Sequence, residues 1–307
     1  MRLSIEYPET ASPARAIVLA QQCEDGGFHG FFLGAAFGFD PLMVLGACGP
    51  ATSSIALGSA VVPSWPRHPV VTAQQALTAQ ALCGGRFRLG LGVSHAPVMK
   101  MYGVEFTRPV SHMREYLHVV HALLHEGRVA FAGKRYDVHA FLAVDGAATP
   151  PPILLAALGP QMASVAGELA DGVIPWLTPP GYVRDVLRPA IATGAARAGR
   201  AAPPVIASVP VVHAATPAAA LEIARRELAV YPHMPFYRAL FDNAGAPVPA
   251  DARWTLEMLD AAVVWGDLDT IEEKLRAYTD AGAAEVICSP IGGDDLFVHL
   301  STIATED

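Results

Sequence analysis

The feature that most constrains this fold is an apolar run followed at once by a helical pattern, in residues 150–174. Ile153–Leu158 is apolar throughout, without alternation, which is typical of a parallel strand covered on both faces. Gly159-Pro160 interrupts the run, and one helical stripe then collects Met162, Val165, Ala166 and Leu169. Asp171-Gly172 ends this helix before another apolar run. The segment therefore predicts a strand, a very short turn, a helix and a second strand.

Strand and helix patterns alternate along the rest of the chain without a break in composition. The expected strands are Leu3–Tyr7, Gly30–Leu33, Ile55–Val62, Phe87–Val93, Ile153–Leu158, Val173–Leu177, Val205–Val212 and Glu285–Ser289. Besides the helix after Gly159, the expected helices are Pro13–Gly26, Asp40–Gly49, Pro69–Leu82, Val110–Glu126, Tyr182–Ala198, Pro217–Val230, Leu268–Ala281 and Asp294–Ile303. Eight such alternations predict a single (β/α)8 TIM barrel domain over residues 1–307.

Two segments depart from the alternation. Val129–Ala132 and Arg135–Val138 flank a Gly-Lys turn like a small hairpin before the fifth strand. Tyr231–Ala262 is rich in proline and predicts a helical insertion over the barrel mouth before the eighth strand. A doubly wound sheet is the competing architecture, but the GLGVSH segment that ends at His95 lacks the third glycine of a dinucleotide fingerprint.

Composition limits the classes of function. The chain is 52% hydrophobic and 16% charged, so it can bury a large core, and its net charge of −8 argues against a nucleic-acid surface. Four cysteines without a CxxC spacing, and no signal peptide or membrane span, indicate a cytoplasmic protein with reduced thiols. His118, His121 and His125 share a helix face outside the barrel, where solvation is a simpler account than zinc binding, so no metal is expected.

In a (β/α)8 barrel the functional groups lie where the strands end, at the carboxyl-terminal face. His95, after the fourth strand, and Glu6, at the end of the first, are therefore candidate catalytic proton donors. His68 is a third candidate that also fits a cap for the helix beginning at Pro69. The aromatic residues that suit a substrate pocket, although several also suit the core, are Phe37, Phe39, Trp65, Tyr102 and Trp176.

The helix after Gly159 offers a place for an anion. N–H groups at its start, at Gln161, Met162 and Ala163, are expected to lack intrahelical acceptors, and the helix dipole favours negative charge there. A glycine also lets backbone pass close to a ligand. Every βα unit has such a turn, however, so these residues alone leave an ordinary turn as the simpler account.

Three stretches together resemble the luciferase-like flavin and deazaflavin oxidoreductases, in the branch that uses coenzyme F420. They are LGSAVVPSWPRHPVVTAQQALTAQALCGGRFRLGLGVSH (57–95), RPVSHMREYL (108–117) and LLAALGPQMASVAGELADGV (154–173). The resemblance implies a commonly dimeric (β/α)8 fold whose cofactor lies at the strand ends, with its tail phosphate on the turn at Gly159. The cofactor-binding positions that it implies are Ser59, Ala60, Val61, Ser94, His95, Ala157, Leu158, Gly159, Gln161, Met162 and Ala163.

The resemblance also implies a cis peptide bond between Ala60 and Val61, where the third strand backs the cofactor ring. The chain departs from the family after the second strand. Many relatives carry an acidic residue and a histidine there, whereas residues 33–38 are Leu-Gly-Ala-Ala-Phe-Gly. A proton donor must therefore come from elsewhere in the mouth.

The activity that the resemblance implies is hydride transfer between reduced coenzyme F420 and an electrophilic C=C, C=N or C=O group of a small organic substrate. Two alternatives remain open: an FMN-dependent monooxygenase on the same barrel, and a barrel that holds a cofactor without turnover. Arg67, Lys100 and Arg108 are cations suited to the acidic cofactor tail, and equally to ordinary surface positions. Apolar residues around much of helices Asp40–Gly49 and Pro69–Leu82 predict a homodimer.

Overall fold

The computed structural model describes residues 1–7, 12–35, 37–291 and 295–305. Eight of its strands are parallel and form a closed barrel in chain order, in which Val205 pairs with Val173 to close the ring. These strands are β1 (Leu3–Tyr7), β2 (Gly30–Leu33), β3 (Ala56–Ser59), β5 (Phe87–Gly92), β8 (Ile153–Ala156), β9 (Gly172–Ile174), β10 (Val205–His213) and β12 (Ala283–Pro290). The predicted (β/α)8 barrel is confirmed.

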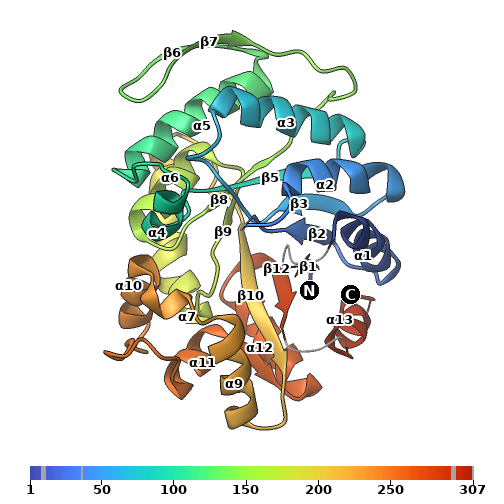
Figure 1. Ribbon diagram of the computed structural model, residues 1–307, viewed down its shortest axis with the longest axis vertical. Coiled ribbons are helices and arrows are strands. Elements are labelled where there is room, and N and C mark those ends of the chain that lie inside the picture. The colour runs from blue at the N-terminus through green and yellow to red at the C-terminus, as the bar shows by residue number, and fades with distance from the viewer. Residues whose placement is uncertain (8–11, 36, 292–294, 306–307) are drawn as a thin grey trace.

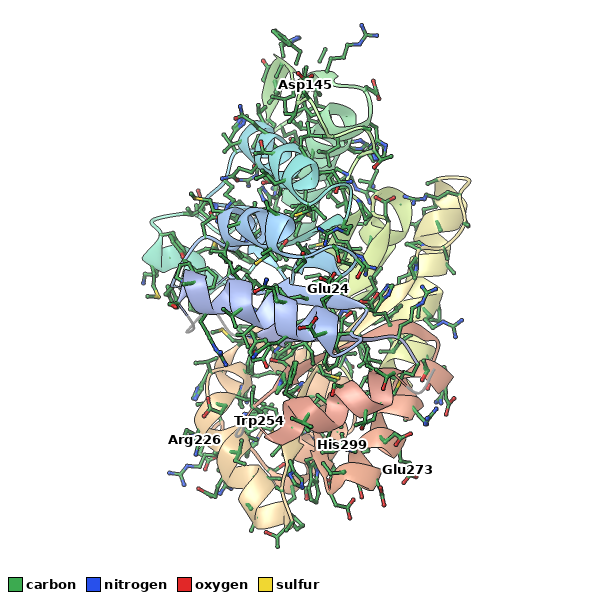
Figure 2. The ribbon with its side chains drawn as sticks, turned by 90° about the vertical axis from the view of Figure 1, so that its right-hand side faces the viewer. Glu24, Asp145, Arg226, Trp254, Glu273 and His299 are labelled. Atoms are coloured by element: carbon green, nitrogen blue, oxygen red, sulfur yellow. The ribbon has the colours of Figure 1, made fainter. Side chains whose placement is uncertain are left out.

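Helices surround the strands (Figure 1). The main ones are α1 (Pro13–Asp25), α2 (Pro41–Cys48), α3 (Pro69–Leu82), α5 (Pro109–His125), α6 (Pro160–Leu169), α8 (Arg188–Arg197), α9 (Pro217–Glu227), α12 (Leu268–Asp280) and α13 (Asp295–Thr305). Local sequence specifies their starts, since proline occupies many first turns and Asp40 caps α2 by accepting the N–H groups of Leu42 and Met43. Figure 2 labels Glu24 on α1, whose carboxylate accepts the N–H groups that lead into β3.

The barrel interior is packed in layers. One buried cluster, against which Val61 packs, consists of Phe32, Leu154, Ile174, Ile206 and Ile287. Nearer the amino-terminal end, Glu285 accepts hydrogen bonds from Ser4 at 2.5 Å and from Arg88 at 2.8 Å. This polar network fills the amino-terminal end, while the opposite end is the one that carries function in barrels of this kind.

The expected strand Ile55–Val62 is divided in two. β3 ends at Ser59, the Ala60–Val61 peptide bond is cis as predicted, and β4 (Val62–Pro63) pairs further along β5. Ser59 Oγ bridges the interrupted pairing, because it donates to the carbonyl of Gly90 and accepts the N–H of Gly90, both at 2.9 Å.

The expected hairpin is present but its second strand is displaced. β6 (Arg128–Ala132) pairs with β7 (Asp137–Phe141), which begins two residues later than predicted. Glu115 on α5 accepts N–H groups of residues 134–136 and so holds them in the turn. In Figure 1 the hairpin lies beyond α3 and α5, at the edge of the molecule.

The expected helix Tyr182–Ala198 is present but contains a π-helical turn. A short α7 (Pro180–Tyr182) leads into a π-helical turn, Val183–Leu187, before α8 begins. The Arg188 N–H bonds to the Val183 carbonyl five residues back. Pro189 has no N–H and cannot donate the hydrogen bond of a regular α-helix. The wider π-helical turn therefore lies directly before this proline.

The insertion before the eighth strand is helical, as predicted. It contains a 3₁₀ turn (Tyr231–His233), α10 (Pro235–Asn243) and α11 (Leu256–Ala262). Trp254 anchors it by donating its indole N–H to the Leu228 carbonyl at 2.8 Å, and Figure 2 places this side chain among the orange elements.

Two short elements were not expected from the sequence. They are α4 (Ala96–Met101), in the segment after β5, and β11 (Val264–Gly266), which pairs with the end of β10. Both are too short for a periodic pattern to stand out. Among the described residues, none of the helices has the length and apolar character needed to cross a bilayer.

Candidate functional site

Glu6 lies near the carboxyl-terminal end of β1 and is half-buried. Ser208, on β10, donates a hydrogen bond of 3.0 Å to its Oε2. Burial raises the pKa of Glu6 to about 7, although the Ser208 hydrogen bond lowers it in part. A Cβ at Gly34, after β2, would lie 3.0 Å from Oε1. A carboxyl group with this pKa exchanges protons readily near neutral pH, and a side chain at position 34 would crowd Oε1.

Four rings form an aromatic wall beside Glu6. Their centroids are 5.3 Å apart for His95 and Tyr237, 4.8 Å for Tyr237 and Tyr231, and 6.0 Å for Tyr231 and Trp176. Burial raises the pKa of Tyr231 to about 12 and that of Tyr237 as well, and the charge of Glu6 acts in the same direction on both. The wall and the carboxyl group therefore belong to one site.

Sequence reasoning missed Tyr231, Tyr237 and Ser208. Both tyrosines come from the insertion, whose segment YPHMPFYRALF (231–241) concentrates aromatic residues over the predicted mouth. Ser208 is a polar residue within the apolar strand VIASVPVV (205–212). These two patterns could have pointed to the three residues. Neither pattern predicts that their side chains lie close to Glu6.

The site contains buried polar atoms without partners. Nε1 of Trp176 and Nδ1 of His95 make no hydrogen bond within the described part of the chain. Burial lowers the pKa of His95, so its imidazole is neutral at pH 7. A buried donor or acceptor without a partner costs about 1–3 kcal/mol, and a ligand that supplies the missing partner removes that cost.

The turn between β8 and α6 fits an anion. Gly159 has a φ of −115°, which any residue adopts, and a Cβ there would meet no atom within 4 Å. Neither packing nor backbone conformation within the described residues requires glycine here, and a glycine allows a ligand to approach the backbone closely. No side chain caps α6, so the N–H groups of Gln161 and Met162 stay available among the described residues. The expectation for Ala163 is wrong, because its N–H donates to the Gly159 carbonyl at 3.0 Å.

The helix that follows this turn is rigidly placed. A Cβ at Gly167 of α6 would lie 2.1 Å from the Ile191 carbonyl oxygen, and a Cβ at Gly194 of α8 would lie 1.9 Å from that of Ser164. Backbone therefore packs directly on backbone between α6 and α8. This contact fixes the position of α6, and with it the start of the helix after Gly159.

The other predicted cofactor positions lie around the end of the same strands. Ser94 follows β5 with a φ of 58°, and Ala157 is buried directly after β8. Leu158 packs against the cluster formed by the insertion, and Ala60 packs beside Val61 on the interior cluster. Ser59 is fully buried, and its hydroxyl is occupied by Gly90 as described above.

The predicted substrate residues divide into separate groups. Trp176 belongs to the aromatic wall, whereas Phe37 and Tyr102 stack with centroids 6.4 Å apart and are 63% and 45% exposed. Phe39 packs against the main core. Position 36 of the small apolar segment after β2 lies outside the described residues, as do positions 292–294.

Trp65 is connected to the mouth through other rings. It stacks on His112 with centroids 3.7 Å apart, and Phe106 lies 5.4 Å from it. Phe106 in turn lies 6.2 Å from Phe236, which is 6.0 Å from His95. The same aromatic surface thus extends from the wall to Trp65.

Charged groups at the rim are fewer than expected. Arg67 forms a salt bridge of 2.8 Å with Asp40, so its charge is already compensated. Lys100 and Arg108 are exposed and form no ion pair within the described residues. His68 caps α3 by accepting the Val70 N–H at 3.3 Å. The sequence is compatible with this capping role as well as with that of a proton donor.

Metal binding finds no support in the part of the chain that the structure describes. None of its His, Cys, Asp and Glu side chains gather in groups that would hold a metal ion. His121 and His125 on α5 stack on each other with centroids 4.1 Å apart. His118 and His125 are exposed, whereas His121 is half-buried and burial lowers its pKa, so the prediction of solvated side chains holds for two of the three histidines.

Comparison with known proteins gives the family. The chain is 26% identical to the 5,10-methylenetetrahydromethanopterin reductase of Methanopyrus kandleri over 94% of this chain and 93% of the relative. It is 29% identical to the F420-dependent glucose-6-phosphate dehydrogenase of Nocardia farcinica over 81% and 77% of the two chains. Its fold matches that of an F420-dependent secondary alcohol dehydrogenase in complex with an F420-acetone adduct, with a TM-score of 0.83, 19% identity and coverage of 100% and 99%. The family model described as luciferase-like monooxygenase matches residues 2–285, nearly the whole barrel, and the chain therefore belongs to the luciferase-like monooxygenase family.

Proposed function

We propose that this chain is a coenzyme F420-dependent oxidoreductase that acts on an electrophilic C=C, C=N or C=O group of a small organic substrate. Glu6 carries the proposal, because a carboxyl group with a pKa of about 7 at the mouth is a suitable proton donor. The names of the relatives from Methanopyrus kandleri and Nocardia farcinica support the reaction class.

The residues that would hold the cofactor fit its chemistry. The free N–H groups of Gln161 and Met162 would bind the tail phosphate, with Gly159 allowing the close approach. Lys100 and Arg108 would meet the acidic tail. When bound in its reduced form, the cofactor supplies a hydride.

The protein's own groups would supply the proton and exclude water. Ser208 donates to Oε2 of Glu6, so the exchangeable proton lies on Oε1, next to the space left by Gly34. His95, neutral and with an unpartnered Nδ1, would accept or donate a hydrogen bond to the substrate. The aromatic wall would shield the reacting atoms from solvent.

We further propose that residues 1–307 form one domain that acts as a cytoplasmic homodimer. Four free, buried cysteines are compatible with a reducing compartment. Met43 on α2 is 74% exposed, and Val71 and Leu82 on α3 are 45% and 50% exposed. A second copy would cover these side chains.

A binding and turnover experiment tests the proposal. The purified protein is titrated with coenzyme F420 and with FMN, and reduced F420 is then mixed anaerobically with a panel of ketones, imines and activated alkenes. We expect tighter binding of F420 and substrate-dependent oxidation of the reduced form. Tight FMN binding with oxygen uptake would favour the monooxygenase alternative, and F420 binding without consumption would favour a barrel that only holds its cofactor.

A further inference from the structure

Ser208 links Glu6 to the aromatic wall through its backbone. Its side chain binds Glu6, and its N–H donates to the Pro175 carbonyl at 2.9 Å, so Trp176 is held in a bridge to β10 directly after β9. The position of the Trp176 indole is therefore set by the residue that also orients the carboxyl group.

Two hydrogen-bond donors face each other beside this carboxyl group. The Trp176 and Tyr231 rings have centroids 6.0 Å apart and an interplanar angle of 52°. Burial and the charge of Glu6 raise the pKa of Tyr231, and a weak side-chain hydrogen-bonding interaction with the Trp176 indole lowers it, so the indole N–H lies close to the tyrosine hydroxyl. The two groups approach without forming a hydrogen bond of acceptable geometry within the described residues.

The chemistry of these two groups determines what they bind. An indole nitrogen is only a donor, and a phenol also carries a donor proton. The Trp176 Nε1 is buried without an acceptor, which is unfavourable unless a ligand provides one. An oxygen atom placed between the two groups would accept a hydrogen bond from each.

We propose that Trp176 and Tyr231 select a carbonyl substrate by donating to its oxygen, a refinement that rests on the proposed oxidoreductase function. The reduced cofactor, when bound, would supply the hydride that forms a C–H bond at the carbonyl carbon, and the π electron pair of the C=O bond would move onto the oxygen held by Trp176 and Tyr231. That oxygen takes the proton from Oε1 of Glu6. The products are an alcohol and the oxidised cofactor, and the carboxylate regains its proton from solvent.

This arrangement favours a carbonyl over the other electrophiles. Negative charge develops on oxygen during carbonyl reduction, where two preorganised donors stabilise it. Hydride addition to a C=C bond that is not conjugated to a carbonyl develops charge away from oxygen, where these donors give no comparable stabilisation, whereas a conjugated enone also places the charge on its carbonyl oxygen. An imine is activated by protonation of its nitrogen, which then has no lone pair to accept a hydrogen bond. The two donor groups would therefore repel the N–H group of the protonated imine.

The first test compares variants that remove one donor each. Trp176→Phe and Tyr231→Phe keep the ring and lose the N–H or O–H, and Trp265→Phe is the control because that indole already donates to Asp260 at 2.8 Å. With cyclohexanone as acceptor, we expect kcat/KM to fall about tenfold or more in each test variant. The control and the affinity for F420 should be unchanged, and thermal unfolding checks that each variant folds.

The second test identifies the bond that is reduced. Cyclohexanone offers a C=O group, 1-pyrroline a C=N group, and 1-cyclohexenecarbonitrile an activated C=C group without a carbonyl oxygen. The fastest reduction is expected with cyclohexanone. Equal or faster reduction of 1-pyrroline or 1-cyclohexenecarbonitrile would overturn the carbonyl assignment while leaving the proposed function intact. If none of the three probes is reduced, the proposed function itself fails for these substrate classes.

A binding measurement decides on the donors without turnover. Isobutyramide carries a carbonyl oxygen that does not accept a hydride, and its affinity for the protein loaded with oxidised F420 is measurable by calorimetry. We expect about fivefold or greater weakening in Trp176→Phe and Tyr231→Phe. Affinity equal to that of the unaltered protein would show that the two groups do not bind the oxygen.

Discussion

Ser208 Oγ donates a hydrogen bond of 3.0 Å to Oε2 of Glu6, although the two residues are 202 positions apart. They stand on β10 and β1, which are not neighbours, because β12 lies between them in the barrel. Their side chains therefore meet inside the closed barrel. In such a barrel, alternate strands contribute side chains to the same interior layer.

Removal of this hydrogen bond should shift the pH dependence of reduction. The Ser208 bond lowers the pKa of Glu6, which burial has raised to about 7. If protonated Glu6 is the donor, the rate is full below this pKa and falls as the pH rises through it. Ser208→Ala should move that fall to higher pH, as measured by kcat/KM for a carbonyl acceptor. Glu6→Gln is the control, since it should lower the rate and remove the step; a step that persists would point to another donor.

Substitution of Gly159 should separate binding from folding. A Cβ there would meet no atom of the described residues within 4 Å and needs no unusual φ, so Gly159→Val should leave the melting temperature nearly unchanged. It should weaken coenzyme F420 binding about tenfold or more by occupying the ligand's approach. Gly194→Ala is the opposite control, because its Cβ would lie 1.9 Å from the Ser164 carbonyl oxygen and should destabilise the fold. Unchanged F420 affinity in Gly159→Val would remove this turn from the site.

Removal of the positive charge of Lys100 or Arg108 should weaken cofactor binding in a salt-dependent way. Lys100→Ala and Arg108→Ala each remove a cation from the rim, and Arg276→Ala removes one that pairs with Glu272 on α12. We expect the first two variants to bind F420 a few-fold more weakly at low ionic strength, and the difference to shrink as salt is added. Equal affinities for all three variants at low salt would exclude the two rim residues from the contact.

The exposed apolar side chains of α2 and α3 should mediate dimerisation. Met43→Asp or Val71→Asp would place a charge on this surface, so we expect the dimer to dissociate to monomers in light scattering at micromolar concentration. Phe141→Asp is the matched control, since this residue is 84% exposed on the hairpin. A monomeric unaltered protein, or a dimer that survives the first two changes but not the third, would contradict this assignment.

The sequence by itself determined the barrel and the short turn at Gly159. Both depend on short-range patterns: the apolar run and small-residue helix on either side of Gly159, and the repetition of such units around the chain. The cis bond at Ala60–Val61 followed from family resemblance and is present. Local sequence also predicted where helices begin, as at the His68 cap of α3. It did not predict that the Ala163 N–H forms a hydrogen bond to the Gly159 carbonyl.

Only the tertiary structure decided which groups surround Glu6. Ser208 reaches it because the sheet closes, and Tyr231 and Tyr237 reach it because the insertion folds back over the mouth. Contacts between residues so far apart leave no periodic signal in the chain. Burial produced by those contacts also raises the pKa of Glu6, since desolvation disfavours the charged carboxylate. The position of an acidic residue at a strand end could be predicted, whereas its protonation near neutral pH is a property of the folded site.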